Sequence, residues 1–183
     1  FEHFLDYGFA SEKITAAERS LLKQSFTAIA QHLDSQPPFL DHRDYHSWNL
    51  MVTGGKIVVI DFQDALLAPL QYDLASLLND RETDRVIGLS AEQRLLEYYL
   101  RRKDALVGTR TDRDEFYETY LLSALQRDFK VVGRFRFLDR VKGKPGYKKY
   151  IPATLRRIQR NLQRASRFAS LIPVLAQHFS ELR

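Results

Sequence analysis

The stretch DHRDYHSWNLMVTGGKIVVIDFQD, residues 41–64, decides the fold. It holds two short apolar runs, residues 50–52 and 57–60, separated by Thr53-Gly54-Gly55-Lys56. Two apolar runs joined by a glycine pair predict a β-hairpin, because glycine readily adopts the positive φ that such a turn needs. This hairpin is the one β element that the sequence predicts.

Helical signals occupy the rest of the chain. Thr15 and Glu18 have the spacing of a capping box, which predicts a helix over residues 16–34 that ends before Pro37-Pro38. After residue 69 the sequence predicts only helices, and three of them begin near capping residues: Asp73, Ser90 and Asp112. A last amphipathic helix is expected over residues 151–168. We therefore expect a mainly α-helical fold, built as one domain over residues 1–183 around a small β-hairpin.

Polar side chains flank the predicted hairpin at one end. Asp44 and Asn49 precede its first strand, and Asp61 and Asp64 follow its second. Because a tight hairpin returns the chain to its starting point, we expect three carboxylates and an amide to gather there. Oxygen ligands of this kind suit a hard cation such as Mg²⁺. Taken singly, each residue is also an ordinary turn former.

The charge is divided unevenly along the chain. The first 126 residues carry 13 basic and 20 acidic side chains, whereas residues 127–183 carry 15 basic and 3 acidic ones. Five arginines of the last predicted helix could form a basic stripe: Arg156, Arg157, Arg160, Arg164 and Arg167. Such a stripe suggests a nucleic-acid-binding module, but solvated helix faces commonly look the same and no nucleic-acid motif is present. Nucleic acid is therefore not an expected partner.

Composition narrows the class of protein. Cysteine is absent, which excludes disulfides and thiolate sites, and the longest apolar runs have four to five residues, too few to cross a membrane. Residues 1–10 contain Glu2 and Asp6 and lack the basic start of a signal peptide. We expect a soluble cytoplasmic protein without a membrane partner. Because the sequence opens at Phe1 and its one methionine is Met51, we also expect a piece of a longer chain.

The combination of motifs resembles a kinase. His-Arg-Asp at residues 42–44, an asparagine five residues after the aspartate, a strand pair and then Asp61-Phe62 follow the order of kinase catalytic and metal loops. This order is similar to the aminoglycoside phosphotransferase and choline kinase-like family. A narrower resemblance, to bacterial anomeric kinases for N-acetylmuramate and N-acetylglucosamine, rests on residues 61–65, Pro69 and three further stretches: residues 72–78, 126–133 and 143–147.

The resemblance implies a role for each flanking residue. Asp44 would be the catalytic base that orients the acceptor hydroxyl and takes its proton, while Asn49 and Asp61 would hold Mg²⁺ against the phosphates of ATP. Asp64 would contact a second metal ion or the sugar. Three residues would support the loop rather than react: His42, Arg43 and Asp73. For Asp73 we expect a buried helix cap, with a substrate contact as the alternative.

The roles of two side chains of the loop, Trp48 and His46, have more than one interpretation. The amino-sugar kinases commonly have a basic residue at the position of Trp48, so the tryptophan either alters a sugar or phosphate contact or simply covers the hairpin. His46 is expected to stabilise the loop through a hydrogen bond rather than to act in catalysis.

One part of such a kinase is missing from the sequence. No G-x-G-x-x-G stretch is present, and Gly54-Gly55-Lys56 lacks the spacing of a Walker loop. The resemblance therefore implies the C-terminal catalytic and substrate lobe of a two-lobed enzyme, inactive without its N-terminal nucleotide lobe. An aminoglycoside, choline or another hydroxyl compound remains an alternative acceptor to an amino sugar. A pseudokinase is disfavoured because Asp44, Asn49 and Asp61 are all present.

Overall fold

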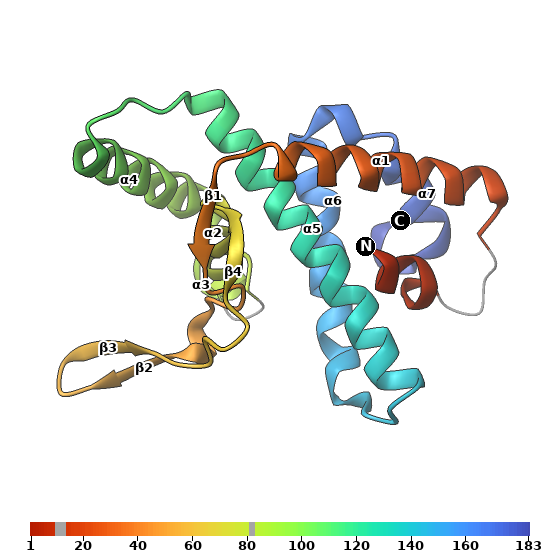
Figure 1. Ribbon diagram of the computed structural model, residues 1–183. Helices are drawn as coiled ribbons and strands as arrows, with labels where there is room; N and C mark the ends of the chain where they lie inside the picture. The colour runs from red at the N-terminus through yellow and green to blue at the C-terminus, as the bar shows by residue number, and fades with distance from the viewer. Residues whose placement is uncertain (10–13, 81–82) are drawn as a thin grey trace. The chain divides into compact units, whose positions relative to one another are not determined.

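The computed structural model describes residues 1–9, 14–80 and 83–183, and the chain forms two compact units. The first unit comprises residues 1–35 and 121–183, and the second comprises residues 36–120 (Figure 1). Helix α5, Arg113–Arg140, contributes residues to both units. None of the helices within the described ranges is long and apolar enough to cross a membrane.

The first unit is a helical bundle around an aromatic core. It contains α1 (Ala16–Asp34), most of α5, α6 (Ile151–Arg164), α7 (Leu171–His178) and short helical segments. Four of these segments are Phe4–Gly8, Pro145–Tyr150, Ser166–Phe168 and Ser180–Leu182. The ring of Phe129 lies 4.8 Å from those of both Phe4 and Phe26, in edge-on contacts that favour close aromatic packing.

A buried ion pair adds to this core. Arg157 of α6 donates to both carboxylate oxygens of Asp128, at 2.7 Å from Nη2 to Oδ1 and 2.9 Å from Nε to Oδ2. Both side chains are almost completely buried. The five arginines expected to form one basic stripe are therefore divided, because Arg157 points into the protein while Arg156 and Arg167 are exposed.

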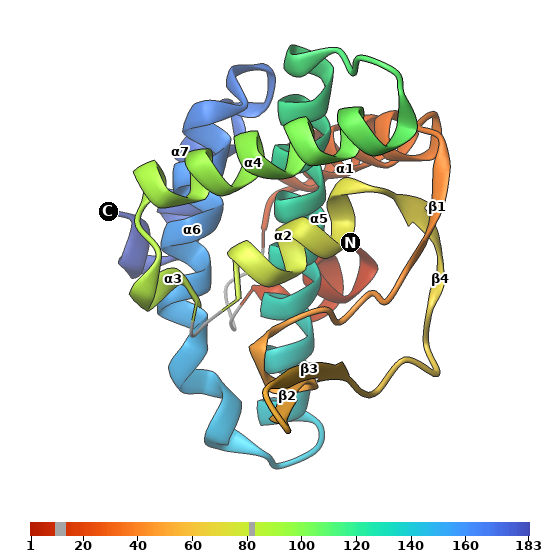
Figure 2. The ribbon, with the colours of Figure 1, turned by 90° about the vertical axis from the view of Figure 1, so that its left-hand side faces the viewer.

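The second unit holds two small antiparallel sheets and the helices that follow them (Figure 2). One sheet pairs β1 (Pro38–Asp41) with β4 (Leu66–Pro69), and the other pairs β2 (Leu50–Thr53) with β3 (Lys56–Val59). The helices are α2 (Gln71–Leu78), α3 (Thr83–Val86), α4 (Leu89–Val107) and the start of α5.

The predicted hairpin is confirmed as the β2–β3 pair. Gly54 and Gly55 form its turn with φ of 55° and 73°, and Leu50 pairs with Val59. Paired positive φ values are typical of the two-residue turn that matches the twist of a hairpin. The hairpin extends away from the β1–β4 pair and exposes most of its apolar side chains (Figure 1).

Several helix predictions are confirmed in the structure. Helix α1 has the expected bounds, and its capping box forms between Thr15 and Glu18. The carboxylate of Asp112 accepts the N–H of Glu115 at 2.9 Å and so caps α5. Local capping chemistry decides these helix starts, which is why they can be read from sequence.

Several predictions of secondary structure were wrong, among them the helix start at Ser90, because α4 begins at Leu89 and Ser90 lies within its first turn. The β1–β4 pair was not expected, because each strand has only four residues and Pro38 pairs with Pro69 at one end. The last amphipathic helix ends at Arg164 rather than Phe168, since a break at Ala165 turns Phe168 into the core. Helix α7 was also missed; its proline, Pro173, lies in the first turn, where helices tolerate it.

Gly133 provides a test of packing in the first unit. A Cβ atom at this position of α5 would lie 2.4 Å from the backbone carbonyl carbon of His3 and 2.5 Å from the backbone nitrogen of Phe4. Backbone atoms cannot move aside as a flexible side chain can, so we expect Gly133→Ala to lower the free energy of unfolding by about 2 kcal/mol. Urea denaturation followed by circular dichroism measures this change.

Gly146→Ala is the matched control. A Cβ atom at Gly146 would have no heavy atom of the described residues within 4 Å, and the residue has no positive φ. Its substitution should therefore leave the unfolding free energy within about 0.5 kcal/mol of the native protein. Equal destabilisation by the two substitutions would contradict the close approach at Gly133.

Candidate catalytic site

Helix α2 fixes the backbone of the loop that joins β1 to β2. The carboxylate of Asp73 accepts the N–H of His42 at 2.7 Å and the N–H of Arg43 at 3.0 Å. One turn further along α2, Ser76 donates its hydroxyl to the carbonyl oxygen of Arg43 at 3.3 Å. Three polar groups of the backbone of His42 and Arg43 are thereby held by one helix, and Asp44 follows them directly.

Asp73 does not occupy the position that the sequence predicted. It lies in the first turn of α2, which begins at Gln71, instead of capping a helix that begins after it. Its carboxylate is therefore available to the 42–44 loop. Its two hydrogen bonds cross about 30 residues of sequence, a contact that no local pattern reveals.

The hairpin brings three of the sequence-predicted residues together. The side-chain amide of Asn49 donates to the carbonyl oxygen of Asp44 at 2.9 Å and to Oδ2 of Asp61 at 3.4 Å. Gln63 donates to Oδ1 of Asp61 at 3.0 Å. The N–H of Ile60 bonds to the carbonyl of Asn49, which continues the β2–β3 ladder and sets Asp61 beside the amide.

His42 ties the two ends of this region to each other. Its ring nitrogen Nε2 lies 2.8 Å from the carbonyl oxygen of Ile60, and only the ring N–H can donate to that oxygen. The imidazole therefore links the loop before β2 to the segment after β3. The supporting role of His42 stays a prediction, which this contact motivates.

Asp64 stays outside the group around Asn49. Its backbone carbonyl accepts a hydrogen bond from Nη1 of Arg43 at 3.3 Å, within a turn closed by the N–H of Ala65 and the carbonyl of Phe62. Among the described residues no three His, Asp or Glu side chains gather as a metal site would require. The expected cluster of three carboxylates is thus not formed, because the turn after Asp61 directs the chain away.

The remaining donor set still fits a hard cation. Asn49 uses its amide nitrogen toward Asp44 and Asp61, so its Oδ1 is the atom that would bind a metal ion together with the Asp61 carboxylate. Mg²⁺ is commonly held by one or two protein oxygens and completed by water and substrate phosphates. Asp61 is exposed and Asp44 half-buried, so both are accessible from solvent.

The backbone is strained at two positions in this site. Arg43 has a φ of 72° and Asp61 a φ of 67°, and within the described ranges no other residue except glycine has a positive φ. Such values cost about 1 kcal/mol or more for a residue with a Cβ atom and persist only where surrounding contacts impose them. Here the Asp73 and Asn49 hydrogen bonds supply those contacts.

Asp41 is a residue of this site to which the sequence motifs assign no role. It ends β1, is 3% exposed, and lies against Asp73. Burial, followed by the negative charge of Asp73 and a side-chain hydrogen bond to it, raises the pKa of Asp41 to about 7. A signal existed, because Asp41 interrupts an apolar strand immediately before the loop.

Two loop residues keep the interpretations open that the sequence allowed. Trp48 is 57% exposed, so much of its ring is accessible to solvent. The carbonyl of His46 accepts the N–H of Asn49, which shapes the short helical turn Ser47–Asn49 before β2. Ser47 donates to the buried carboxylate of Asp80 at 3.2 Å.

An apolar cavity of about 370 Å³ opens beside this loop. Ser47 lines it together with apolar residues of α2, α4 and the segment between them: Leu77, Leu78, Val86, Ile87 and Leu95. Ser47 is three residues from Asp44, so the cavity borders the loop that carries the candidate base. Its size suits a small organic molecule.

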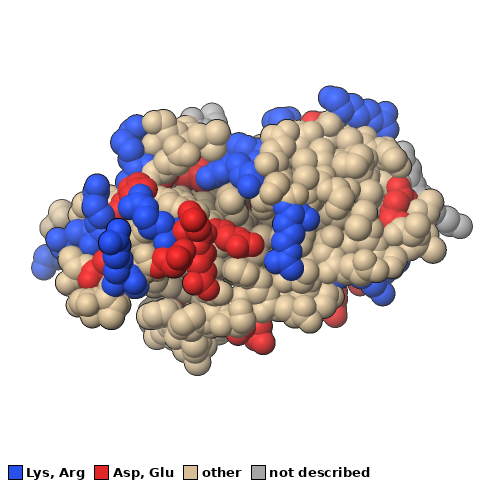
Figure 3. All heavy atoms as spheres, turned by 90° about the horizontal axis from the view of Figure 1, so that it is seen from above, with Lys and Arg blue, Asp and Glu red and all other residues tan. Residues whose placement is uncertain are grey.

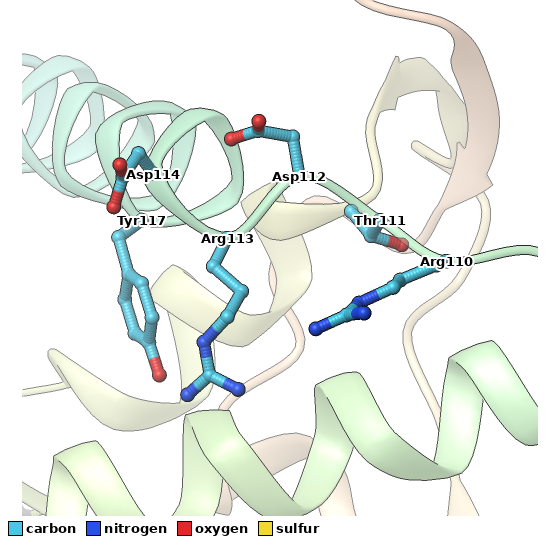
Figure 4. A pocket seen from close by; sticks show the side chains of 6 residues that line it. All are labelled: Arg110, Thr111, Asp112, Arg113, Asp114 and Tyr117. Carbon is cyan, nitrogen blue, oxygen red and sulfur yellow. The ribbon is translucent and has the colours of Figure 1, made fainter.

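A second, polar cavity of about 580 Å³ lies at the start of α5 (Figure 4). Arg113 and Tyr117 point from α5 toward α4, where both bind the carboxylate of Glu97. Thr111 bonds to Asp104, and Asp112 caps the helix. The hydrogen-bond partners of these side chains are residues of α4, of α5 or of the segment between the two helices. None of the sequence-predicted site residues lines the cavity, so we assign it to the α4–α5 junction and not to the candidate catalytic site.

Charge on the outer face of this junction is mixed. The space-filling view from above shows lysines, arginines, aspartates and glutamates interleaved over α4 and the start of α5 (Figure 3). Exposed members of both signs include Arg101, Arg102, Arg110, Asp112 and Asp114.

Comparison with known proteins identifies relatives of this chain. A family model described as the phosphotransferase enzyme family matches residues 8–116. The N-acetylmuramate/N-acetylglucosamine kinase of Neisseria meningitidis is 34% identical over 169 residues, which cover 90% of this chain and 49% of the relative. The enzyme of that name from Pseudomonas putida is 31% identical over 167 residues, 89% of this chain and 48% of the relative.

A solved structure has a similar fold. A choline/ethanolamine kinase family protein from Mesorhizobium loti matches all of this chain and 57% of its own, with a TM-score of 0.59 and 13% sequence identity. That likeness extends the protein-kinase-like fold to this chain, as the sequence predicted. The chain spans about half the length of the curated relatives it matches.

Proposed function

This chain belongs to the phosphotransferase enzyme family, and from that membership we propose that it carries the catalytic and acceptor-binding part of an ATP- and Mg²⁺-dependent sugar kinase. The observation that carries the proposal is the amide of Asn49, which contacts both the Asp44 backbone and the Asp61 carboxylate. The candidate base and the candidate metal ligand are thus held by one side chain. This is the arrangement that phosphoryl transfer between ATP and a hydroxyl needs.

Each residue then has a distinct role. Asp44 orients the acceptor hydroxyl and accepts its proton as the new oxygen–phosphorus bond forms and the bond to ADP breaks. Asn49 and Asp61 hold Mg²⁺, which neutralises charge on the phosphates when it is bound. For Asp64 we keep the proposal of a second-metal or sugar contact. His42, Arg43 and Asp73 hold the loop.

The acceptor that the relatives favour is an amino sugar. These relatives are named N-acetylmuramate/N-acetylglucosamine kinases, and we propose that the anomeric hydroxyl of such a sugar is phosphorylated here. Because the reaction consumes ATP and handles cell-wall sugars, we place it in cytoplasmic cell-wall recycling.

A panel of acceptors tests the substrate class. The longer enzyme that contains residues 1–183, given MgATP, should phosphorylate N-acetylmuramate or N-acetylglucosamine at least tenfold more efficiently, as kcat/KM, than kanamycin, choline or homoserine. Coupled ADP release measures turnover, and ³¹P NMR identifies the phosphorylated position. A preference for an aminoglycoside or choline would reject the amino-sugar acceptor while keeping the kinase assignment.

Substitutions of the candidate base and metal ligand test the roles. We expect Asp44→Ala and Asp61→Asn each to lower kcat by about a thousandfold or more, because general-base and metal contributions are each worth about that factor. Asp114→Asn is the control, since Asp114 is exposed and outside the site. Thermal unfolding must show that the variants are folded. Near-native turnover of either site variant would refute its role.

We further propose that a nucleotide lobe outside residues 1–183 completes the enzyme. The relatives are about twice as long, and this sequence lacks the glycine-rich loop of kinases. The second unit also exposes apolar side chains over the hairpin and its continuation, the hairpin surface: Met51, Val52, Ile57, Val58, Ile60 and Phe62. A surface of this kind is normally covered by other protein.

This proposal predicts weak nucleotide binding by residues 1–183 alone. Calorimetric titration with MgATP should give a dissociation constant weaker than about 1 mM, equivalent to less than about 4 kcal/mol of binding free energy. The site would lack the backbone cradle and the lysine that grip the phosphates. Micromolar affinity of this chain would contradict the need for another lobe.

A further inference from the structure

Asp41 and Asp73 bring two carboxyl groups together behind the 42–44 loop. Asp41 is 3% exposed at the end of β1, opposite Leu66 of β4, which offers it no charge. Its Oδ2 atom has no hydrogen-bond partner among the residues that the structure describes. A buried carboxylate oxygen without a donor is costly, and a proton removes that cost by neutralising the group.

Asp73 differs from Asp41 in the number of backbone donors that it accepts. Its two oxygens each accept one backbone N–H, from His42 and Arg43. Backbone donors favour the ionised form of a carboxyl group; Asp41 receives one backbone hydrogen bond, from Asp73, whereas its Oδ2 accepts none among the described residues. The proton of the pair therefore belongs on Asp41, and a protonated Asp41 gains a donor that the Asp73 carboxylate can accept.

The described groups that face this pair come from α4 and from the 42–44 loop. From α4, Tyr99 lies close enough that the charges of Asp41 and Asp73 raise its pKa, after the larger effect of its own burial. From the loop, Nε2 of His42 is engaged with Ile60, and Nη1 of Arg43 with the carbonyl of Asp64. Burial and the charge of Asp73 together raise the pKa of Asp41 to about 7.

We propose that Asp41 is a positioning residue whose single proton, shared with Asp73, keeps the 42–44 loop in its catalytic conformation. Loss of the proton places two negative charges side by side in a buried site. When Asp73 relieves that repulsion by moving away from Asp41, its bonds to the N–H groups of His42 and Arg43 break. The carbonyl and positive φ of Arg43 then lose their support, and Asp44 is released with them.

The direction of the pH effect follows from the proton count. In the folded state Asp41 keeps its proton up to a pKa of about 7, whereas in the unfolded state it loses the proton at its lower, ordinary pKa. The contribution of this proton to the folding free energy is therefore complete below about pH 4 and is lost as the pH rises through about 7. The 42–44 loop should therefore be ordered in mildly acidic solution and loosen in alkaline solution. This inference goes beyond phosphoryl transfer and stands without it.

Hydrogen exchange of the His42 and Arg43 amides tests the proposal on residues 1–183. Exchange rates are measured by NMR from about pH 6 to pH 8.5 and divided by the intrinsic rate at each pH, which gives protection factors. We expect native protection to fall about tenfold across this range, because the proton-linked stability of the ordered loop is lost as the pH rises to the Asp41 pKa of about 7 and is constant above it. Protection that stays level to the upper pH would overturn the proposal.

Asp41→Asn is the decisive variant, since asparagine has the same shape and cannot ionise. Protection of the two amides should then be independent of pH, whereas the control Asp114→Asn, at an exposed position, should follow the native profile. A native-like fall in the Asp41→Asn protein would refute the role of Asp41. The structural alternative, a merely space-filling Asp41, predicts equal profiles for native and variant proteins.

The native protein supplies a second test that needs no variant to fold. The ¹³C resonance of the Asp41 carboxyl should titrate with a midpoint near 7, and a midpoint below about 5 would overturn the shared proton. If the longer enzyme proves to be a kinase, its kcat should decline above pH 7 in the native form and not in Asp41→Asn. If it proves not to be one, the exchange and ¹³C results still decide the inference.

Discussion

Two consecutive backbone N–H groups, those of His42 and Arg43, end on the single carboxylate of Asp73. Most of the site depends on this contact. It fixes the loop against α2, a regular helix whose own position is set by buried residues such as Tyr72 and Ala75. A catalytic loop has little regular structure, so a helix must supply the rigidity that positions a reacting group. Here the side chain of Asp73 connects the loop to that rigid helix.

The hairpin adds a second constraint. The ladder between β2 and β3 sets Asn49 beside Ile60, and the Asn49 amide then reaches both Asp44 and Asp61. Positive φ at Arg43 and Asp61 is tolerable because surrounding hydrogen bonds hold each residue in place. The strained backbone conformations before and after the hairpin are therefore held by contacts that also bring the candidate base and metal ligand together.

The parts of this structure that sequence predicts are those decided by local chemistry. The turn at Gly54-Gly55 needs positive φ, and the helix starts after Thr15 and Asp112 need a capping oxygen; each requirement lies within a few residues. The parts that it does not predict depend on distant partners. The local pattern predicts that Asp73 caps a helix. In the structure, its carboxylate accepts hydrogen bonds from residues about 30 positions away, which no local pattern reveals. The β1–β4 ladder likewise pairs residues 38–41 with residues 66–69, and neither strand carries a signal of its own.

Distance in sequence also explains why a resemblance can suggest roles for Asp44, Asn49 and Asp61 while leaving Asp41 unnoticed. A motif selects residues that act on the substrate, whereas Asp41 acts through the protonation of its neighbour. Its burial is what gives it a role, because the same carboxyl group in water would be ionised and would cost nothing. Among its described residues the second unit buries only seven hydrophobic side chains, so polar contacts must contribute much of the stability of the loop. Under that constraint, one proton more or less in the Asp41–Asp73 pair matters to the catalytic loop far more than it would above a large hydrophobic core.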